Sequence, residues 1–317
     1  MSTRLPCGSA PGLFAVLILM GAAWGAVFPI VKIAVSTGYG PYGIMVWQMM
    51  IGLALAGAIL LARGRRPVLA PRFFGVFLGM ALLGTVVPNH FSYTAAAHLP
   101  AGILSIVIAL VPLFALPISL ALGFEKPALL RFLGLGLGAV AVGLLIGPGA
   151  RLPGSESAWY VILAAGAALA YAGEGNFLTW YGARGLDAFQ ILFGASLVSL
   201  VIALPVAVAT GQFVSPFRPW QAADWAVLAS SVINMLTYAA YVWTIGRAGP
   251  VFAAQVAYLI TGFGVIWSIL FLGEHYAPGV WAAMGLMLAG VFLVQPRRAT
   301  VAGRKLVPPG GMGKDAL

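Results

Sequence analysis

The sequence predicts an all-α integral membrane protein with ten transmembrane helices, arranged as two inverted five-helix repeats. Apolar residues make up 62% and charged residues 8% of the 317-residue chain, a balance that does not suit the solvated surface of a water-soluble domain. Runs of about 20 apolar residues, enough to cross a bilayer core about 30 Å thick, follow one another along the chain. Stretches such as AGILSIVIALVPLFALPISLALG are apolar without alternation, which argues against a transmembrane β-barrel.

The apolar runs define the ten predicted helices, and short polar breaks separate them. The approximate spans are 11–35, 42–62, 73–97, 99–123, 128–147, 158–182, 186–209, 224–246, 248–272 and 279–296. The first run could be read as a signal peptide, but it continues to Val35 and nine spans follow, so we expect an uncleaved helix. The only cysteine, Cys7, excludes an internal disulfide.

The basic residues segregate to one side of these spans. Of the 17 Lys and Arg residues, all but three fall on the side that also holds both termini. Arg151 and Arg218 fall on the other side, and Lys32 lies within a span. This is the positive-inside pattern, which predicts that both termini are cytoplasmic. The formal net charge of +10 is therefore explained by membrane topology rather than by nucleic-acid binding, and no nucleic-acid module surrounds the basic loops.

The chain repeats itself internally. HLPAGILSIVIALVPLFALPISLALGFEKP in the first half aligns with RAGPVFAAQVAYLITGFGVIWSILFLGEHYAP in the second, and this pairs Pro100 with Pro250 and Gly123 with Gly273. Because each copy has five helices, the second copy must cross the membrane in the opposite sense. Inverted repeats are characteristic of secondary transporters, whose substrate sites lie near the midplane between the halves. The expected boundaries are 11–147 and 158–296, with a disordered cytoplasmic tail at 297–317.

Several motifs carry a resemblance to a known family. GAAWGAVFPIVK, YTAAAHLPAG followed by ALVPLF, FLGEHYAPG and GLMLAGVFL resemble the EamA-type family of the drug/metabolite transporter superfamily over residues 11–296. The first half departs from the pattern, because its LGE element reads LGFEKP and places Glu125 one residue later. The resemblance implies a ten-helix transporter, commonly an exporter of amino acids, metabolites or drugs. It also implies a central cavity lined mainly by helices 1, 3, 4, 6, 8 and 9.

Glu174 is the only one of the seven acidic residues that lies mid-span. A carboxylate there costs a few kcal/mol on insertion scales and is a functional hypothesis by default. Counting about 1.5 Å per residue from each span centre places a polar layer level with it. Two alternatives stay open for Glu174: substrate binding or proton coupling, and a structural carboxylic acid hydrogen-bonded to a neighbouring helix. The candidate substrate-binding residues are Trp24, Asn89, Tyr93, Glu174, Asn234, Tyr238, Gln255 and Tyr258.

Two further groups of residues are candidates for coupling and movement. His90 could relay protons with Glu174, or it could be a satisfied histidine in a polar crevice. Pro112 interrupts its helix and aligns with Gly262, and matched interruptions indicate a binding site or hinge, with a packing kink as the alternative. Lys32 shares a face with Trp24 but lies about 18 Å from the depth of Glu174 at 1.5 Å per residue, so no ion pair between them is expected. Whether Lys32 lines the cavity or extends to the interface stays open.

The sequence favours a transporter over the other classes considered. It has no H-E-x-x-H, P-loop or G-x-S-x-G motif, which indicates neither an enzyme nor an ATP-driven pump. No cofactor and no metal site are expected. An integral-membrane enzyme acting on lipid-linked substrates and a non-transporting membrane subunit or receptor remain the alternatives. We expect an exporter in a bacterial inner membrane whose partners are a small-molecule substrate, the lipid bilayer and protons. Glycine pairs such as Gly21 and Gly25 predict close helix packing within a monomer or at a homodimer contact.

Overall fold

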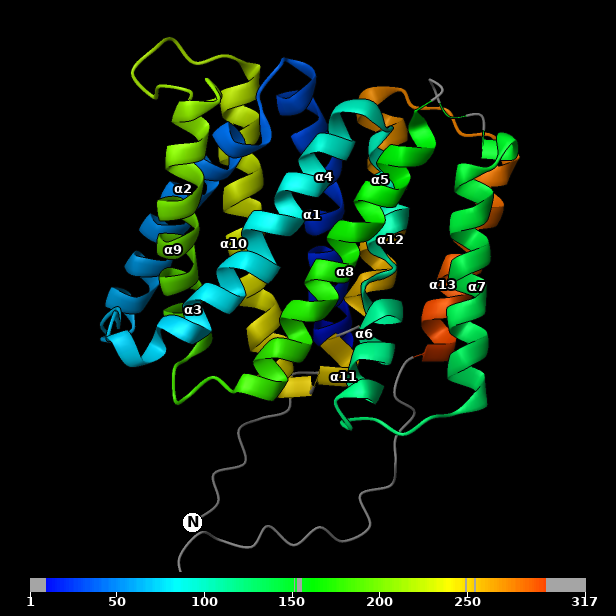
Figure 1. Cartoon of the computed structure of the whole chain (residues 1–317), viewed down its shortest axis with the longest axis horizontal. Helices are drawn as coiled ribbons and strands as arrows, with labels where there is room; N and C mark the ends of the chain where they lie inside the picture. Colours follow the sequence, from blue (N-terminus) through cyan, green and yellow to red (C-terminus); the bar gives the residue numbers. More distant parts are fainter. Residues whose placement is uncertain (1–9, 151, 153–155, 249, 254, 295–317) are drawn as a thin grey trace, which may run out of the picture.

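All the regular secondary structure in the described part of the chain is helical. The computed structural model describes residues 10–150, 152, 156–248, 250–253 and 255–294, and these residues contain no β-strand (Figure 1). The α-helices are α1 (Ala10–Ser36), α2 (Pro41–Ala62), α3 (Phe74–Ala81), α4 (Val87–His98), α5 (Ala101–Ile108), α6 (Val111–Ala121), α7 (Leu129–Ile146), α8 (Ser157–Tyr181), α9 (Ala188–Ala209), α10 (Ala222–Ala248), α11 (Pro250–Ala253), α12 (Val256–Leu272) and α13 (Pro278–Val294). The 3-10 helices are η1 (Pro71–Phe73) and η3 (Pro148–Ala150), and η2 (Leu82–Val86) is a π-helix.

Eight segments are long and apolar enough to cross a membrane. They are Pro11–Ser36, Pro41–Ala62, Pro71–His98, Ala101–Ala121, Leu129–Ile146, Ser157–Tyr181, Ala188–Ala209 and Ala222–Thr244. Two shorter apolar helices, Val256–Leu272 and Pro278–Val294, follow at the positions of the ninth and tenth predicted spans. The third and fourth predicted spans are each built from more than one element: η1, α3, η2 and α4 form one, and α5 and α6 form the other.

Local sequence explains where several helices begin and end. Asp187 accepts from the backbone amides of Phe189 and Gln190, and the Gln190 side chain accepts from the Asp187 amide, which makes a capping box at the start of α9. Gly273 ends α12 in the left-handed conformation, with φ of 65°, a backbone region that glycine enters without steric cost. Pro41 and Pro278 open α2 and α13, where a missing N–H leaves no hydrogen bond unmade.

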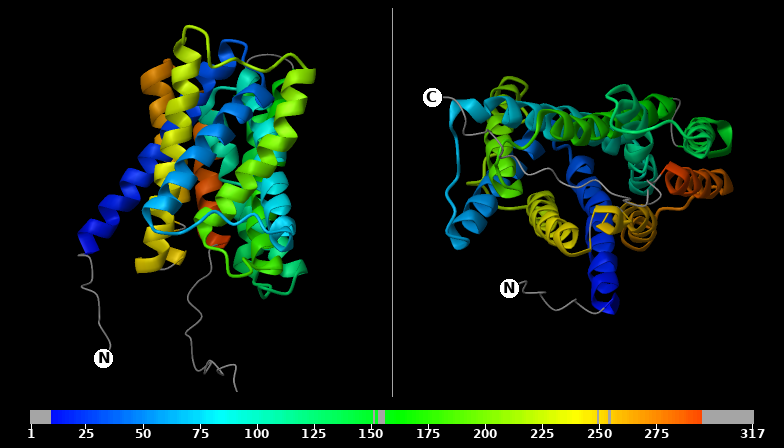
Figure 2. Two further views of the ribbon diagram at one scale, coloured as in Figure 1. Left: turned by 90° about the vertical axis from the view of Figure 1, so that its left-hand side faces the viewer. Right: turned by 90° about the horizontal axis from the view of Figure 1, so that it is seen from below.

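The main helix contacts join the first half of the chain to the second half, so the halves do not form two separate bundles. Helix α1 lies along α10 and α12, α2 along α9, α4 along α8, and α7 along α13. Figure 2 (right) shows the α7 and α13 pair standing together at one edge of the bundle, seen end-on. The connections α2–α3, α6–α7 and α8–α9 lie at one end of the bundle, the lower end in Figure 1. The basic loop residues Arg63, Arg65, Arg66, Arg72, Lys126 and Arg184 belong to these connections.

Glycines allow the closest of these helix contacts, as their spacing predicts. A Cβ atom added at Gly25 on α1 would lie 2.8 Å from the Gly264 amide nitrogen on α12. One added at Gly290 on α13 would lie 2.7 Å from the Gly134 carbonyl oxygen on α7. Because real Cβ atoms do not approach backbone atoms this closely, the helices can meet at these points only through glycine.

Gly290→Ala should therefore destabilise the protein. Its methyl group has only the α7 backbone to displace, and overpacking of this kind costs about 1–3 kcal/mol. Gly285 is a matched control on the same helix, because a Cβ there has no neighbour within 4 Å. We expect thermal unfolding in detergent micelles to occur at a lower temperature for Gly290→Ala and at an unchanged or higher temperature for Gly285→Ala. Equal midpoints for the two variants would contradict the packing assigned to Gly290.

Candidate functional site

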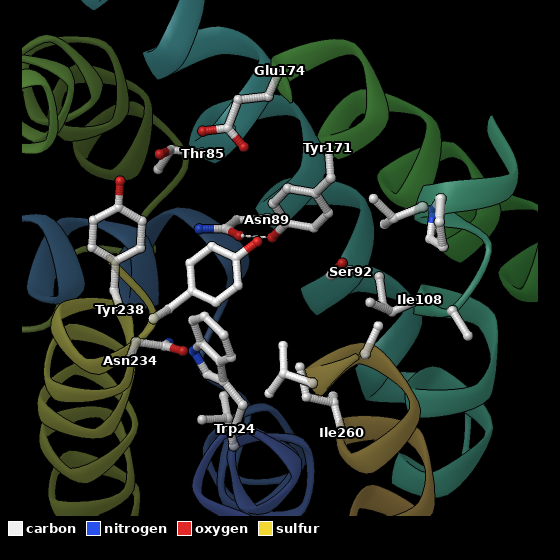
Figure 3. Close-up of a pocket in the computed structure, with 18 of the residues that line it drawn as sticks. Trp24, Thr85, Asn89, Ser92, Ile108, Tyr171, Glu174, Asn234, Tyr238 and Ile260 are labelled. Carbon is white, nitrogen blue, oxygen red and sulfur yellow. Dashed lines mark hydrogen bonds between the residues drawn. The ribbon is translucent and has the colours of Figure 1, made fainter. Parts of the chain in front are cut away.

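A cavity of about 860 Å³ lies between the helices of the two halves. Its wall is mostly apolar and draws on both halves of the chain, from Trp24 on α1 to Ile260 on α12 (Figure 3). At one end it extends to Glu125 and Arg131, which form an ion pair of 2.7 Å across the α6–α7 connection. Six of the predicted substrate-binding residues line it: Trp24, Asn89, Tyr93, Glu174, Asn234 and Tyr238. The structure therefore brings together residues from α1, α4, α8 and α10.

Glu174 extends from α8 into this cavity without a cationic partner among the described residues. The ion pairs there join Arg65 with Asp187, Arg131 with Glu125 and Arg218 with Asp224. In Figure 3 the carboxyl group of Glu174 points toward Thr85. Its nearest titratable neighbours include Tyr171 on the same helix and Tyr238 on α10. An unpaired carboxyl group in a mostly apolar wall can be neutralised by a proton or by a cation that enters the cavity.

Hydrogen-bonded polar side chains form a second part of the wall. The Tyr171 hydroxyl donates to Asn89 Oδ1 at 2.8 Å, the bond drawn in Figure 3. The Tyr93 hydroxyl donates to Gln48 Oε1 at 2.5 Å. Gln48 is 6% exposed, and its Nε2 has no hydrogen-bond partner among the described residues. A buried amide donor without a partner costs about 1–3 kcal/mol, so Gln48 Nε2 is a donor that a ligand could satisfy.

Aromatic rings flank these polar groups. Trp24 and Tyr241 lie with their ring centroids 5.7 Å apart, and Phe28 lines the cavity one helical turn beyond Trp24. Figure 3 shows the Asn234 amide next to the Trp24 indole. Rings of this kind attract organic cations and cover apolar surface.

Some of the predicted residues do not line this cavity. Gln255 is the residue before α12. Tyr258 packs against the core, and its buried hydroxyl has no hydrogen-bond partner in the part of the chain that the structure describes. On α12 the residues facing the cavity are Val256, Ala257, Ile260 and Thr261. Depth along the helix axis can be counted from the sequence, but the face that α12 presents cannot. Gln255 and Tyr258 therefore lie outside this wall.

His90 illustrates the same point on α4. Thr85, Asn89, Ser92, Tyr93 and Ala96 line the cavity from η2 and α4. Their spacing of three and four residues marks one helix face. His90 lies about 100° around the helix from Asn89 and is outside the lining. Its ring stacks on Tyr42 with centroids 5.1 Å apart, and its buried Nδ1 has no hydrogen-bond partner within the described ranges.

The helix interruptions are not at matching positions in the two halves. Helix α5 ends at Ile108 and α6 begins at Val111, so the fourth predicted span breaks just before Pro112, which lines the cavity. In the second half α12 runs through Gly262 without a break, because glycine, unlike proline, keeps its backbone N–H. The interruption there falls before Val256, between α11 and α12.

Lys32 neither enters the cavity wall nor pairs with Glu174, in agreement with the predicted depths. Its ammonium group donates to the carbonyl oxygens of Ala96 at 2.6 Å and Leu99 at 2.9 Å. Ala96 lies in the last turn of α4 and Leu99 is the residue after it, a helix end where the dipole favours a cation. Across the α4–α5 turn, Glu274 accepts from the backbone amides of Ala101 at 2.7 Å and Gly102 at 3.2 Å. The two charges thus stabilise the two helix ends that meet in this turn.

Tyr276 completes this arrangement beside the turn. Burial raises the pKa of its hydroxyl well above the usual value, and the Glu274 carboxylate beside it raises that pKa further. The hydroxyl therefore stays protonated and donates to Glu274. Glu274 belongs to the second half of the chain and α5 to the first, so the contact joins the two halves. The aligned residue Glu125 instead pairs with Arg131.

Glu274→Gln should loosen the α4–α5 turn. One carboxylate oxygen becomes an NH₂ group that cannot accept from an amide, and the lost charge-assisted bond costs about 1.5–3 kcal/mol. Hydrogen exchange of a peptide covering residues 99–104 should become faster in Glu274→Gln. The neighbouring exposed residue provides the control, since His275→Gln should leave the exchange unchanged. Unaltered exchange in Glu274→Gln would contradict the role given to this carboxylate.

Comparison with known proteins agrees with these features. The model of the EamA-like transporter family matches residues 11–147 and 158–295. An uncharacterized inner membrane transporter of Escherichia coli (strain K12), YedA, is 27% identical over 94% of this chain and 95% of its own. A probable terminal-alkyne amino-acid exporter of Streptantibioticus cattleyicolor is 23% identical over 93% of this chain and 96% of its own. A solved crystal structure shares the fold with a TM-score of 0.61, at 17% identity over 88% of this chain and 96% of that one.

These matches establish the class of the protein. The apolar spans and the inner-membrane relatives make it an integral inner membrane protein. The relatives and the family are named as transporters. With two family matches that cover most of the sequence, the chain belongs to the EamA-like transporter family.

Proposed function

We propose that this protein is a secondary active transporter that exports small metabolites or amino-acid-like, amphiphilic compounds. The observation that carries the proposal is the cavity of about 860 Å³ between the two halves, with an unpaired carboxyl group in a largely apolar and aromatic wall. The volume suits a small organic molecule. The related probable amino-acid exporter supports the direction of transport and a substrate that carries an amine.

Alternating access of two inverted five-helix halves, residues 11–147 and 158–296, is the proposed mechanism. The eight long spans and two shorter apolar helices support ten crossings, and the helix pairs formed between halves support movement of one half against the other. The cavity extends toward the α6–α7 connection, at the end that carries the basic loops. The positive-inside pattern makes that end cytoplasmic. A cavity reached from the cytoplasm is the arrangement in which an exporter loads its substrate.

Eight residues form the proposed binding site, six of them predicted from the sequence, and each has a chemical role. Glu174 takes the cationic group of the substrate or a proton, and Trp24, Tyr93 and Tyr238 cover its apolar body. Asn89 and Asn234 supply amide groups that orient it. Gln48 and Tyr171, which complete the polar wall, join them. Proton exchange at Glu174 would couple export to the proton gradient.

The test is flux in proteoliposomes that contain the purified protein and a pH-sensitive dye. In a panel of amphiphilic amines, amino acids and anions of similar size, the charge of a compound should decide whether it is transported. Amines and amino acids should move across the membrane and release or take up protons, and matched carboxylic acids without an amine should not. Binding of panel members without flux would indicate a receptor or subunit. Chemical conversion of a panel member would indicate an enzyme.

A further inference from the structure

The π-helix η2 lies against Glu174 and interrupts the regular α-helical register between α3 and α4. It joins α3 to α4, and the amide of Val87 bonds to the carbonyl of Leu82, five residues earlier. In the same register the next carbonyl, that of Leu83, would accept from residue 88. Residue 88 is a buried proline, which has no N–H to donate. The sequence therefore leaves the Leu83 carbonyl without its partner in this register, next to Gly84 and Thr85 of the cavity wall.

The carboxyl group of Glu174 is packed onto this turn. A Cβ atom added at Gly84 would overlap both the carboxyl carbon and an oxygen of Glu174, which shows that the carboxyl rests on the backbone of residue 84. The side chain of the preceding residue, Leu83, also lies against α8. Its Cδ2 is 3.7 Å from the position that a Cβ would take at Gly173, the residue before Glu174. Thr85 lines the cavity beside the carboxyl, as Figure 3 shows. Glycine at 84 is what lets the carboxyl reach the peptide bond that joins Leu83 to Gly84.

We propose that the protonated carboxyl of Glu174 donates its O–H to the Leu83 carbonyl that Pro88 leaves unpaired. The inference rests on the proposed proton-coupling role of Glu174 and names the partner of its proton. When the proton leaves, two oxygens that both accept face each other, and the contact becomes repulsive. The π-helix then loses its partner, and the α3–α4 segment is released from α8. π-helices inside longer helices are frequent at functional sites, and here the irregular turn would follow the protonation state of one side chain.

The elements packed on α8 carry few other ionisable side chains near the Glu174 carboxyl. Helices α3, α5 and α6 and the π-helix contain none. Helix α4 carries Tyr93, hydrogen-bonded to Gln48, and His90, which faces away from the cavity. It ends in His98, which stacks on Tyr160 of α8. Helix α7 carries Arg131, paired with Glu125, and α8 itself carries Tyr171, bonded to Asn89. Across the cavity, α10 contributes Tyr238 and Tyr241. Glu174 is therefore the only carboxyl group in this set without a cation.

Infrared difference spectroscopy tests the proposal without a substrate. The purified protein in lipid nanodiscs is stepped in pH, and the C=O stretch of a protonated carboxyl group reports its hydrogen bonding. The band that disappears in Glu174→Gln belongs to Glu174. In Pro88→Ala the restored amide competes for the Leu83 carbonyl, so the band should shift toward the position of a free carboxyl. Pro205→Ala, at an exposed proline inside α9, should leave the band where it is.

Hydrogen exchange supplies a second measurement. Peptides covering residues 82–92 should lose protection when the wild-type protein is deprotonated, after correction for the intrinsic pH dependence, and should stay protected in Glu174→Gln. An unshifted band in a folded Pro88→Ala variant, or equal loss of protection in Glu174→Gln, would overturn the proposal. Its failure is separable from that of the proposed function. Transport without proton movement would remove the coupling and leave the band shift intact. Proton-coupled transport with an unshifted band in Pro88→Ala would keep the proposed function and remove the hydrogen bond to Leu83.

Discussion

Glu174→Gln is expected to abolish the pH dependence of substrate binding and transport. In the wild-type protein a proton and a substrate cation compete for one carboxyl group, so binding of a cationic substrate should strengthen as pH rises and the proton leaves. Glutamine has the same shape but cannot take up a proton or carry a negative charge. A hydrogen bond to a charged group contributes about 1.5–3 kcal/mol, roughly ten- to hundred-fold in affinity. The measurement is binding of the amines that pass the flux screen, across a pH series.

The control for this variant is a carboxyl group next to the same helix but outside the cavity. Glu156 is exposed and directly precedes α8, so Glu156→Gln should bind and transport like the wild-type protein at every pH. Proton movement recorded by the internal dye should disappear only in Glu174→Gln. If Glu174→Gln transports with an unchanged pH profile, Glu174 is a structural carboxylic acid and the proposed coupling is wrong.

Gly84→Val is expected to inactivate transport by displacing the Glu174 carboxyl. A side chain at residue 84 would occupy the position of that carboxyl, and the protein would have to rotate Glu174 away from the cavity wall or open the contact between α8 and η2. Loss of the carboxyl's position should cost as much as loss of its charge, again about ten- to hundred-fold in affinity. Gly84→Ala should show the same effect at a smaller size, because only one methyl group is added.

Gly175 provides the comparison on the other side of this contact. It lies next to Glu174 on α8, and a Cβ there meets no atom within 4 Å. Gly175→Ala should therefore transport normally, and its helix should be slightly more stable because alanine has the higher helix propensity. Gly84→Val and Gly175→Ala should be measured for flux in proteoliposomes and for thermal stability in the same detergent. Wild-type flux in a folded Gly84→Val protein would mean that the carboxyl does not need its place against the π-helix.

The sequence predicts the helices and groups residues by depth for a physical reason. Helix length and hydropathy are set by the bilayer, and depth follows from counting residues along an axis, so the positions of Glu174, Asn234 and Tyr238 in the chain place them at one level. The face that each helix presents is set by packing against its neighbours. Gln255 and Tyr258 therefore lie outside the cavity wall although the sequence groups them with Glu174 by depth. The same reason explains why the sequence groups His90 with Asn89 although their side chains point in different directions.

Other features depend on contacts that no local pattern reports. Gln48 is a lone amide in an apolar run, and only its bond to Tyr93 places it at the cavity. The π-helix at Leu82–Val86, with its five-residue hydrogen bond from Val87 to Leu82, is a second feature that the apolar pattern does not report. Depth alone excludes Lys32 as the partner of Glu174. Its actual partners, the carbonyls of Ala96 and Leu99 at the end of α4, depend on the fold.

The α4–α5 turn has a consequence for the order in which the chain assembles. Lys32 and the carbonyls that it binds belong to the first half, so this contact can form as soon as the first five helices have entered the membrane. The amides at the start of α5 have no carboxylate acceptor until Glu274 is synthesised, 173 residues after Ala101. Until then the early intermediate carries a helix end without its acceptor. Synthesis of the second half would thus complete the first, and the half-length chain would be a target for membrane quality control.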